Sequence, residues 1–394
     1  MLNNLVLCLS KHALMRSIVH LDLDSFFVSV ERLRNTALVG QPLIIGGSGN
    51  RGVVASCSYE TRYFGVHSAM PIKLAKRLCP QAIILRGDMD AYSKYSKLVT
   101  EVIRDQSPLY EKTSIDEFYV DLTGMDRFFG CFQWSKELRQ RITRETGLPV
   151  SFGLSVNKLV SKVGTGEAKP DGQIEVPRGM EKQFLAPLSV SKIPMIGDKT
   201  YRKLCNMGVR KVSTLSAIPA RLLEREFGKS GISLWQKANA IDDSPVVPYS
   251  ESKSISTEQT FSEDTTDIIR LRALLVTMTE RLGFELRSSQ RLTSCVTVKV
   301  RYSDFNTHTQ QRQVYYSSND DVLIKYVQEL FDKLYSRRVL IRLIGVKFSS
   351  LVHGNHQIDL FSDTNKMINL YQAMDKMKIK YGPGSVKRAV GIKQ

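Results

Sequence analysis

The sequence lacks any apolar run close to the roughly 18 residues that a membrane-spanning helix needs, so we expect no transmembrane segment. Its six cysteines include no Cys-x-x-Cys pair, which fits neither a zinc site nor a small disulfide framework. We therefore expect reduced thiols in a cytoplasmic protein. Acidic residues are also in the minority, with 39 Asp and Glu against 56 Lys and Arg and a net charge of +17. This excess indicates a polyanionic partner, either nucleic acid or an anionic membrane surface.

The length of 394 residues is sufficient for several folded domains, since a domain usually takes roughly 100–200 residues. A content of 42% hydrophobic and 24% charged residues is typical of a folded chain. Near the start, the apolar stretch Leu5–Leu9 is shorter than the roughly 7–15 residues of a signal-peptide core. Because Met15 directly precedes the first predicted strand, Ser17–Leu21, we interpret residues 1–14 as an appendage or a misassigned start.

The positive charge is unevenly distributed along the chain. Residues 188–240 carry a net charge of +7, whereas residues 241–352 carry only +1. The segments 1–187 and 353–394 carry +5 and +4. A polybasic membrane anchor would place its charge at a terminus or on an amphipathic helix. The concentration in the middle of the chain favours nucleic acid as the partner.

Two short motifs contain paired carboxylates. Asp22 and Asp24 follow the first predicted strand, and residues two apart share a strand face. In the segment Ser114–Leu122, Asp116 has the strand parity of apolar residues, where an ionised carboxylate is costly unless a cation compensates it. Asp116 and Glu117 converge on one site only where the strand turns or bulges. Each motif alone fits a solvated strand end, whereas together they form a set of oxygen ligands suited to magnesium.

Further motifs occur in a fixed order between Arg16 and Leu351. They are Asp22-Leu-Asp-Ser-Phe-Phe27, Ser58-Tyr-Glu-Thr-Arg-Tyr-Phe-Gly-Val66, Ser68-Ala-Met-Pro71, Ser114-Ile-Asp-Glu117, Ser151-Phe-Gly-Leu-Ser155 with Asn157-Lys158, and Lys169-Pro-Asp-Gly172. In order and spacing this set resembles the Y-family translesion DNA polymerases of the DNA polymerase IV type.

The resemblance implies an α/β (α+β) fold of the right-hand polymerase class, with four domains and a tail. The implied boundaries are residues 15–33 and 88–182 for the palm, 34–87 for the fingers, 183–248 for a thumb with a helix-hairpin-helix, 253–352 for the little finger and 353–394 for the tail.

The resemblance also implies that Asp22, Asp116 and Glu117 hold two Mg²⁺ ions, with the carbonyl of Leu23 contacting one of them. Spacing alone does not separate Asp22 from Asp24, and the resemblance favours Asp22 with Asp24 in support. Two ions roughly 3.5–4 Å apart lower the barrier to in-line attack on phosphorus. Such chemistry needs no Ser/His/Asp or Cys/His nucleophile arrangement, and we find none in the sequence.

Other positions match residues that bind the incoming deoxynucleoside triphosphate (dNTP) in this family. Tyr59 and Arg62 are three apart, which places them on one face of a helix. Lys169 matches a further triphosphate-binding position, and Ser56 provides a hydroxyl nearby. Phe27 resembles the steric gate that excludes a ribose 2′-hydroxyl, although an isolated phenylalanine is more often a core residue.

One departure from the family lies just before Lys169. The family often has an acidic residue where this chain has Gly166, and the neighbouring Glu167 is a candidate replacement.

The segment Lys192–Val209 has the pattern of a helix, a tight turn and a helix, and it resembles a helix-hairpin-helix. The backbone amides of such a turn bind a DNA phosphate without contacting bases, which makes Ile196, Gly197 and Lys199 candidate DNA contacts. Met195 replaces the first glycine of the usual turn, so we expect an adjusted hairpin. An ordinary helical hairpin is the alternative, and the local charge of +7 favours DNA binding.

Between Lys253 and Leu351 the pattern changes to alternating strands and helices. Strands are predicted over Cys295–Tyr302 and Ile341–Phe348, with a helix over Asp320–Tyr335. The segment resembles the little finger, which lies across the template duplex. Candidate backbone contacts are Lys253, Arg301, Arg342 and Lys347, with solvated strand ends as the alternative.

The tail contains Gln357-Ile-Asp-Leu-Phe361, which resembles the peptide that bacterial polymerases insert into the sliding clamp. Leu360 and Phe361 would be its apolar anchors, and a last core strand is the alternative. Met367–Tyr381 has the pattern of an amphipathic basic helix. Its sequence leaves open whether it binds a partner or packs back on the protein.

These features predict a monomeric, template-directed DNA polymerase that extends a primer past damaged bases with low fidelity. Its partners would be primer-template DNA, dNTPs and, for processivity, the sliding clamp. One alternative is a UmuC-like catalytic subunit that depends on partner proteins. Another is a non-catalytic DNA-binding member of the family, against which the intact carboxylates argue. A nucleotide cyclase with a related palm would need neither the hairpin nor the little finger.

Overall fold

The computed structural model describes residues 16–47, 49, 51–125, 130–248, 251–335, 337, 339–354, 364–382 and 384–391. The chain divides into two compact units, Met1–Ser250 and Glu251–Gln394, called unit 1 and unit 2 below. The predicted appendage 1–14 and the predicted clamp peptide Gln357–Phe361 lie outside the described residues. None of the helices within the described ranges combines the length and hydropathy needed to cross a membrane.

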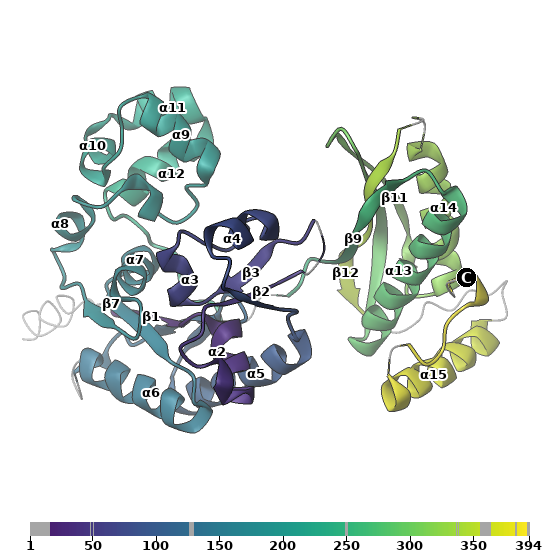
Figure 1. Ribbon diagram of the computed structural model, residues 1–394, viewed down its shortest axis with the longest axis horizontal. Helices are drawn as coiled ribbons and strands as arrows, with labels where there is room; N and C mark the ends of the chain where they lie inside the picture. Colours follow the sequence, from purple (N-terminus) through teal and green to yellow (C-terminus); the bar gives the residue numbers. More distant parts are fainter. Residues whose placement is uncertain are drawn as a thin grey trace, which may run out of the picture. The chain divides into compact units, whose positions relative to one another are not determined.

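A five-stranded sheet organises unit 1 (Figure 1). Its spatial order is β5 (Tyr110–Lys112), β6 (Glu117–Asp121), β1 (Ile18–Leu23), β7 (Val150–Ser155) and β8 (Gln173–Glu175). The central strand β1 pairs antiparallel with both β6 and β7. This pairing brings the two carboxylate motifs, about 95 residues apart in the sequence, together at one end of the paired strands β1 and β6.

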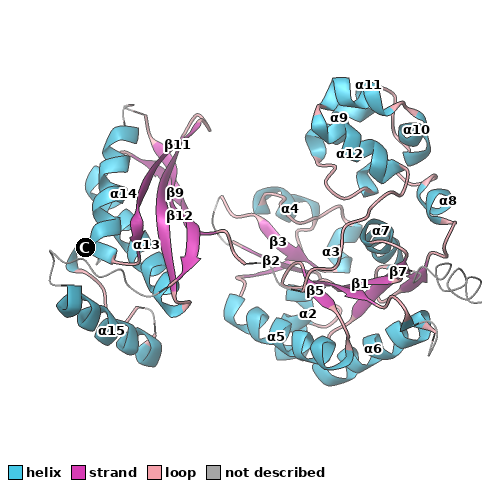
Figure 2. Cartoon of the chain, turned by 180° about the vertical axis from the view of Figure 1, so that it is seen from behind, coloured by secondary structure: helices cyan, strands magenta, loops and turns pink. Residues whose placement is uncertain are grey.

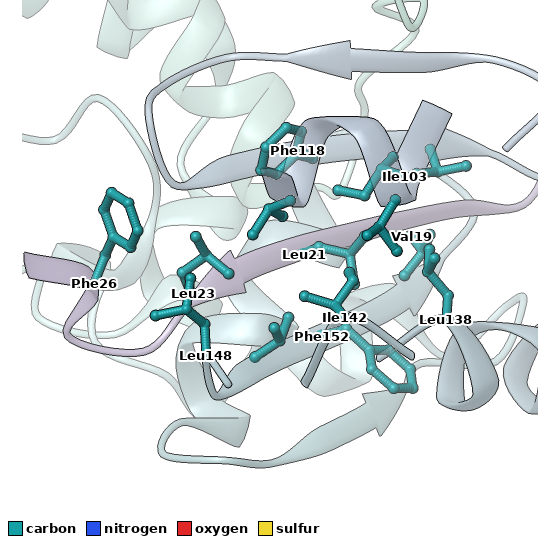
Figure 3. Packing of buried hydrophobic residues seen from close by; sticks show 14 of the residues in the cluster. Val19, Leu21, Leu23, Phe26, Ile103, Phe118, Leu138, Ile142, Leu148 and Phe152 are labelled. Carbon is teal, nitrogen blue, oxygen red and sulfur yellow. The ribbon is translucent and has the colours of Figure 1, made fainter. Parts of the chain in front are cut away.

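The two faces of β1 have different roles because side chains alternate along a strand. Val19, Leu21 and Leu23 are buried in the main core with side chains of α5 (Met89–Gln106) and α6 (Cys131–Thr146), as Figure 3 shows. On the other face, His20 contacts Thr165 of α7 (Lys158–Ala168) through a 2.9 Å hydrogen bond. Asp22 has the same parity as His20, so the strand directs this carboxylate away from the apolar core.

A smaller sheet follows α2 (Phe26–Arg34) in the chain. Its order is β3 (Val54–Cys57), β2 (Leu43–Gly46) and β4 (Ile83–Leu85), and it is accompanied by α3 (Tyr59–Tyr63) and α4 (Ile72–Leu78). The first predicted strand, observed as β1, and the predicted helix at Tyr59 are both confirmed.

The last part of unit 1 is helical. It contains α8 (Glu181–Leu185), α9 (Asp198–Asn206), α10 (Val212–Ala217), α11 (Ala220–Phe227) and α12 (Lys229–Ala238). Leu204, Leu215 and Leu223 form a buried cluster with residues of α7, which joins these helices to the rest of unit 1.

Unit 2 is a four-stranded antiparallel sheet with two helices on one face (Figure 2). The chain order is β9 (Ser254–Thr265), α13 (Ile268–Ser288), β10 (Arg291–Tyr302), β11 (Thr307–Ser317), α14 (Asp320–Leu334) and β12 (Ile341–His353). The sheet order is β11-β10-β12-β9. The predicted strands at Cys295 and Ile341 and the predicted helix at Asp320 are confirmed, although the strands extend further than predicted.

The predicted tail helix is also confirmed, as α15 (Thr364–Tyr381), and it packs back on unit 2. The guanidinium of Arg287 on α13 forms a 2.7 Å ion pair with Asp375 and another with Asp320. The ring of Tyr371 is almost fully buried, with the Arg287 guanidinium 4.7 Å above it. Of the two alternatives for this helix, the structure therefore has it packed against the protein.

Candidate active site

Asp22 and Glu117 are direct cross-strand partners in β1 and β6. Asp116 lies immediately before β6, in a turn organised by Ser114 rather than in the strand itself. The Ser114 hydroxyl accepts from the amide of Glu117 at 3.0 Å and donates to Oδ1 of Asp116 at 2.5 Å. The amide of Leu23 donates to the carbonyl of Asp116 at 3.1 Å. The turn is thus the feature that brings Asp116 and Glu117 to one place, as the sequence required.

A hollow of about 160 Å³ opens beside these carboxylates. Seven of the predicted residues line it, together with Ser25, Phe26, Ala55 and Ser68. The seven are Asp22, Leu23, Phe27, Ser56, Arg62, Asp116 and Lys169. Segments from four regions of the sequence therefore converge at one hollow. Glu117 and Tyr59 lie next to lining residues without lining the hollow themselves.

Two lysines neutralise the carboxylates. Nζ of Lys169 lies 2.5 Å from Oδ1 of Asp22, and Nζ of Lys162 lies 2.6 Å from Oε2 of Glu117. Burial nevertheless raises the pKa of Asp22 to about 6, against the lowering effect of Lys169 and with a further increase from Glu117 and Asp116. The Asp22 carboxylate is thus short of positive charge even with an ammonium beside it.

Asp24 has a different environment from Asp22. Its side chain is only 2% exposed. Oδ2 accepts from the Ser151 hydroxyl at 2.7 Å and from the amide of Asp171 at 2.8 Å, and Oδ1 accepts from the hydroxyl of Tyr59 at 3.2 Å. Asp24 therefore ties together β7, α3 and the loop after α7, while Asp22 faces the hollow.

The carboxylates suit a divalent cation in their chemistry. Among the described residues, no group of three His, Cys, Asp or Glu side chains is arranged to hold a metal ion as it stands. The ammonium of Lys169 occupies the position beside Asp22 that a cation would take. Burial raises the pKa of Asp22, and the nearby Glu117 and Asp116 carboxylates raise it further, so this position would favour a cation. Carboxylate and carbonyl oxygens are the preferred donors for Mg²⁺, so the residues fit such an ion once Lys169 moves away.

The opposite wall of the hollow is basic and comes from α3. The Ser58 hydroxyl caps this helix by accepting from the amide of Thr61. The guanidinium of Arg62 lies 4.7 Å from the centre of the Tyr59 ring, and its Nε donates to the carbonyl of Cys57 at 3.3 Å. This stacking fixes the guanidinium while leaving most of its donors available to an anion.

Phe26 and Phe27 both line the hollow, but Phe26 is buried in the core whereas Phe27 is only partly buried. The Phe27 ring stacks on Tyr92 with ring centres 4.2 Å apart and planes 12° from parallel. The hydroxyl of Tyr92 donates to Glu31 at 2.7 Å. Tyr92 thus holds Phe27 in one orientation at the wall of the hollow.

Sequence reasoning missed Lys162 and Tyr92 as parts of this site. A signal for Lys162 was present, because it lies four residues after Lys158 and therefore on the same helix face. Tyr92 carried no local signal, since its stacking on Phe27 depends on the packing of α5 against α2.

The predicted hairpin differs from the expectation in its first helix. Only a short 3₁₀ turn, Val190–Lys192, precedes the tight turn, and α9 follows it. Met195 adopts φ +75°, so the chain keeps the left-handed turn despite losing the glycine. Gly197 is the N-cap of α9, and Lys199 is exposed in its first turn.

Glu167, the candidate replacement for an acidic residue at Gly166, forms a 2.8 Å ion pair with Lys192.

Two of the four basic candidates of unit 2 share one face of the sheet. Lys347 is exposed opposite Thr297, on the sheet face away from the buried Val296, Val298 and Val300. Arg301 follows the buried Val300 in the alternation of β10, so it lies on the same exposed sheet face as Lys347. Its Nε donates to the Thr307 hydroxyl at 2.8 Å.

The other two candidates differ from this pair. Arg342 lies at a register shift of β12, between Ile341 and Leu343, and its guanidinium lies over the Phe305 ring at 4.5 Å. Lys253 is exposed just before β9.

Comparisons with known proteins identify similar sequences and folds. The model of the impB/mucB/samB family matches residues 21–166, and that of the impB/mucB/samB family C-terminal domain matches residues 252–360. The chain is 38% identical over 375 residues to a DNA polymerase IV of Dehalococcoides mccartyi, covering 94% of this chain and 96% of the relative. It is 35% identical to DNA polymerase IV 2 of Methanosarcina mazei, covering 88% and 96%.

Solved structures also resemble this chain. A Y-family DNA polymerase chimera matches with a TM-score of 0.74 at 24% identity, covering 86% of this chain and all of that one. DinB from Sulfolobus solfataricus matches with a TM-score of 0.60 at 25% identity over the same shares. These matches show that the mixed helix and sheet fold is that of right-hand polymerases.

Proposed function

The chain belongs to the impB/mucB/samB family, and on this premise we propose that it is a translesion DNA polymerase of the DNA polymerase IV type. It extends a primer along a template past damaged bases. The observation that carries this conclusion is the convergence of paired carboxylates, Arg62, Lys169 and Phe27 at one hollow. A DNA-binding protein without polymerase activity would have no use for this combination of anionic and cationic groups.

We assign the predicted domains to the observed elements as follows. The palm (15–33 and 88–182) contains the five-stranded sheet, and the fingers (34–87) contain the small sheet. The thumb (183–248) contains α9 to α12, and α8 spans its boundary with the palm. The little finger (253–352) is the sheet of unit 2 with α13 and α14.

Relatives of this type imply a divalent metal, and we propose two Mg²⁺ ions held by Asp22, Asp116, Glu117 and the Leu23 carbonyl. When bound, such ions activate the primer hydroxyl and neutralise the triphosphate. The protein's own contribution is positioning. The Ser114 turn aims Asp116, the Lys162 ion pair orients Glu117, and Asp24 fixes the adjoining segments.

The incoming dNTP lies, in this proposal, between the carboxylates and the basic wall. Arg62 and Tyr59 on α3, with Ser56 on β3, bind its phosphates. Lys169 releases Asp22 and pairs with the triphosphate, which is a stronger anion. Phe27, held by Tyr92, excludes a ribose 2′-hydroxyl by contact.

Primer-template DNA is the macromolecular partner in this proposal. The hairpin at Ile196, Gly197 and Lys199 supplies phosphate contacts, and the high local charge supports them. On unit 2, Arg301 and Lys347 are favoured because they lie on the face that the helices leave uncovered. Lys253 is exposed and remains a candidate, whereas Arg342 is engaged with Phe305.

The tail supplies the proposed contact with the replication machinery. Gln357, Leu360 and Phe361 bind the sliding clamp, and the enzyme otherwise acts as a monomer in the cytoplasm. Clamp-dependent processivity that survives Leu360→Ala with Phe361→Ala would contradict this part of the proposal.

Primer extension by the purified chain, with Mg²⁺ and four dNTPs, tests the proposed function. We expect extension on an undamaged template and continued synthesis past a minor-groove guanine adduct. Activity of the isolated chain would also count against a UmuC-like subunit that needs partners. Absence of extension on both templates by a folded preparation would contradict the enzyme assignment.

A further inference from the structure

A second hollow of unit 1 lies behind the turn that carries Asp116. Its volume is about 380 Å³, and it lies between α5 and the connection from β5 to β6. Four of its lining residues carry hydroxyls and one carries an ammonium group. The lining residues are Ser93, Ser96, Lys112, Thr113, Ser114 and Ile115.

Lys112 differs from the other lysines around this sheet. Its Nζ donates to the hydroxyls of Ser96 at 2.7 Å and Thr100 at 2.9 Å, both neutral partners. Three nearby lysines instead form ion pairs with carboxylates. These pairs are Lys158 with Glu111, Lys162 with Glu117, and Lys169 with Asp22.

The charge of Lys112 is therefore uncompensated by the described carboxylates. Partial burial lowers the pKa of its ammonium, and no neighbouring acid offsets this effect. An anion placed in the hollow would restore the missing electrostatic stabilisation. An ammonium is a donor that suits phosphate oxygens. The hydroxyls of Ser93 and Thr113, which here donate to the carbonyls of Met89 and Glu117, can rotate to donate to them as well.

We propose that this hollow is a binding subsite for a phosphate group, held by Lys112 and the hydroxyls around it. Two sources have this chemistry, a backbone phosphate of bound DNA and free inorganic phosphate or pyrophosphate. Only the DNA source rests on the proposed polymerase function.

The subsite is connected to the carboxylates by short hydrogen bonds. The Ser96 hydroxyl, which accepts from Lys112, donates to the carbonyl of Ile115 at 2.5 Å. Ser114 lines the hollow and also holds Asp116. A phosphate bound to Lys112 is thus connected through Ser96 to the turn that carries Asp116.

The test compares Lys112→Gln with Lys97→Gln. Lys97 is exposed on α5, the helix that contributes Ser93 and Ser96 to the hollow, but it does not line the hollow itself. Both variants therefore lose one positive charge from one region. Lys112→Arg is the variant that keeps the charge. The first measurement is a titration with inorganic phosphate at constant ionic strength, followed by the amide NMR signals of Thr113 and Ser114. The second is the salt dependence of primer-template affinity.

We expect saturable phosphate-induced shifts in the wild type, Lys97→Gln and Lys112→Arg, and their loss in Lys112→Gln. If the DNA backbone is the source, Lys112→Gln also reduces the slope of log affinity against log salt by about 0.9 more than Lys97→Gln does. A changed salt slope without phosphate shifts supports the DNA source, and shifts without a changed slope support free phosphate. Identical behaviour of Lys112→Gln and Lys97→Gln in both measurements overturns the subsite. Failure of the wild type to bind primer-template would contradict the proposed function instead, while the phosphate titration still tests the hollow.

Discussion

Nζ of Lys169 lies 2.5 Å from Oδ1 of Asp22, so one ammonium group occupies the place beside the carboxylate that faces the hollow. The same lysine is a proposed ligand of the incoming triphosphate. A single group that first pairs with Asp22 and then with a triphosphate would keep the empty site neutral and free the carboxylate when substrate arrives. The titration of Asp22 therefore reports on its environment before Lys169 leaves.

The first prediction concerns the pH dependence of Asp22. Its folded-state pKa of about 6 lies above the ordinary value of 3.8, so the folded protein holds the proton more tightly than the unfolded chain. The resulting stabilisation is fully present below pH 3.8 and is lost as the pH rises through 6. Relative to Asp22→Asn, the free energy of unfolding of the wild type should fall by on the order of 3 kcal/mol between pH 4 and 8. Urea unfolding across this range measures it, and a pH-independent difference between the two proteins would contradict the assigned shift.

The second prediction concerns sugar discrimination by Phe27. Phe27→Ala should lower the preference for dNTPs over ribonucleotides by at least about tenfold, or about 1.4 kcal/mol, with DNA synthesis largely retained. The physical reason is loss of the ring that would contact the 2′-hydroxyl. Single-nucleotide primer extension with each sugar gives the ratio of kcat/KM values.

Tyr92 provides the matched control for the gate. Tyr92→Phe keeps the stacked ring and loses only the hydrogen bond to Glu31, so discrimination should persist. Tyr92→Ala removes the support of Phe27 and should weaken discrimination. Unchanged sugar selection in Phe27→Ala would refute the steric gate.

The third prediction concerns the hairpin turn. Met195 has φ +75° and is 89% exposed, so its side chain contributes little packing while its backbone is strained. Met195→Gly should raise the free energy of unfolding by about 1 kcal/mol, since a left-handed conformation costs roughly 1–2 kcal/mol for other residues. Met195→Ala keeps the strain and should leave stability nearly unchanged. Equal stabilities of the glycine and alanine variants would show that the turn is unstrained.

The fourth prediction concerns the attachment of the tail helix. Arg287 and Asp375 have side chains only 7% and 16% exposed, so removing one partner leaves a buried charge poorly compensated. Because Arg287 keeps its ion pair with Asp320, Asp375→Ala should destabilise unit 2 by about 2 kcal/mol and accelerate hydrogen exchange throughout α15. Lys376→Ala, an exposed neighbour, is the control. Wild-type exchange rates in Asp375→Ala would mean that the ion pair does not hold the helix.

The sequence predicted the strands that carry the paired carboxylates because these depend on local patterns, whereas only the family resemblance favoured Asp22 over Asp24. Alternation predicted which face of β6 is apolar, and the adjacency of Asp116 and Glu117 required the turn that Ser114 provides. The hydrophobic pattern could not show which of Phe26 and Phe27 is the buried core residue. Two adjacent phenylalanines have the same hydrophobicity and differ only in the side chains that pack against them.

Long-range contacts explain the remaining differences. The ion pair of Lys162 with Glu117 joins residues 45 positions apart, and the burial of Tyr371 depends on Arg287 of another helix. The sequence of α15 is basic and amphipathic whether it binds a partner or its own protein, so only the structure distinguishes these states. The short 3₁₀ turn before Met195 likewise reflects packing around the hairpin rather than local propensity.

The most direct test of the central claim compares wild type and Asp116→Ala in primer extension with Mg²⁺, alongside primer-template affinity measured on the same preparations. The proposed site predicts no detectable extension by Asp116→Ala and an affinity equal to or slightly above that of the wild type, since a negative charge has been removed near DNA. Extension by Asp116→Ala at the wild-type rate would contradict the assignment of this carboxylate turn as the catalytic centre.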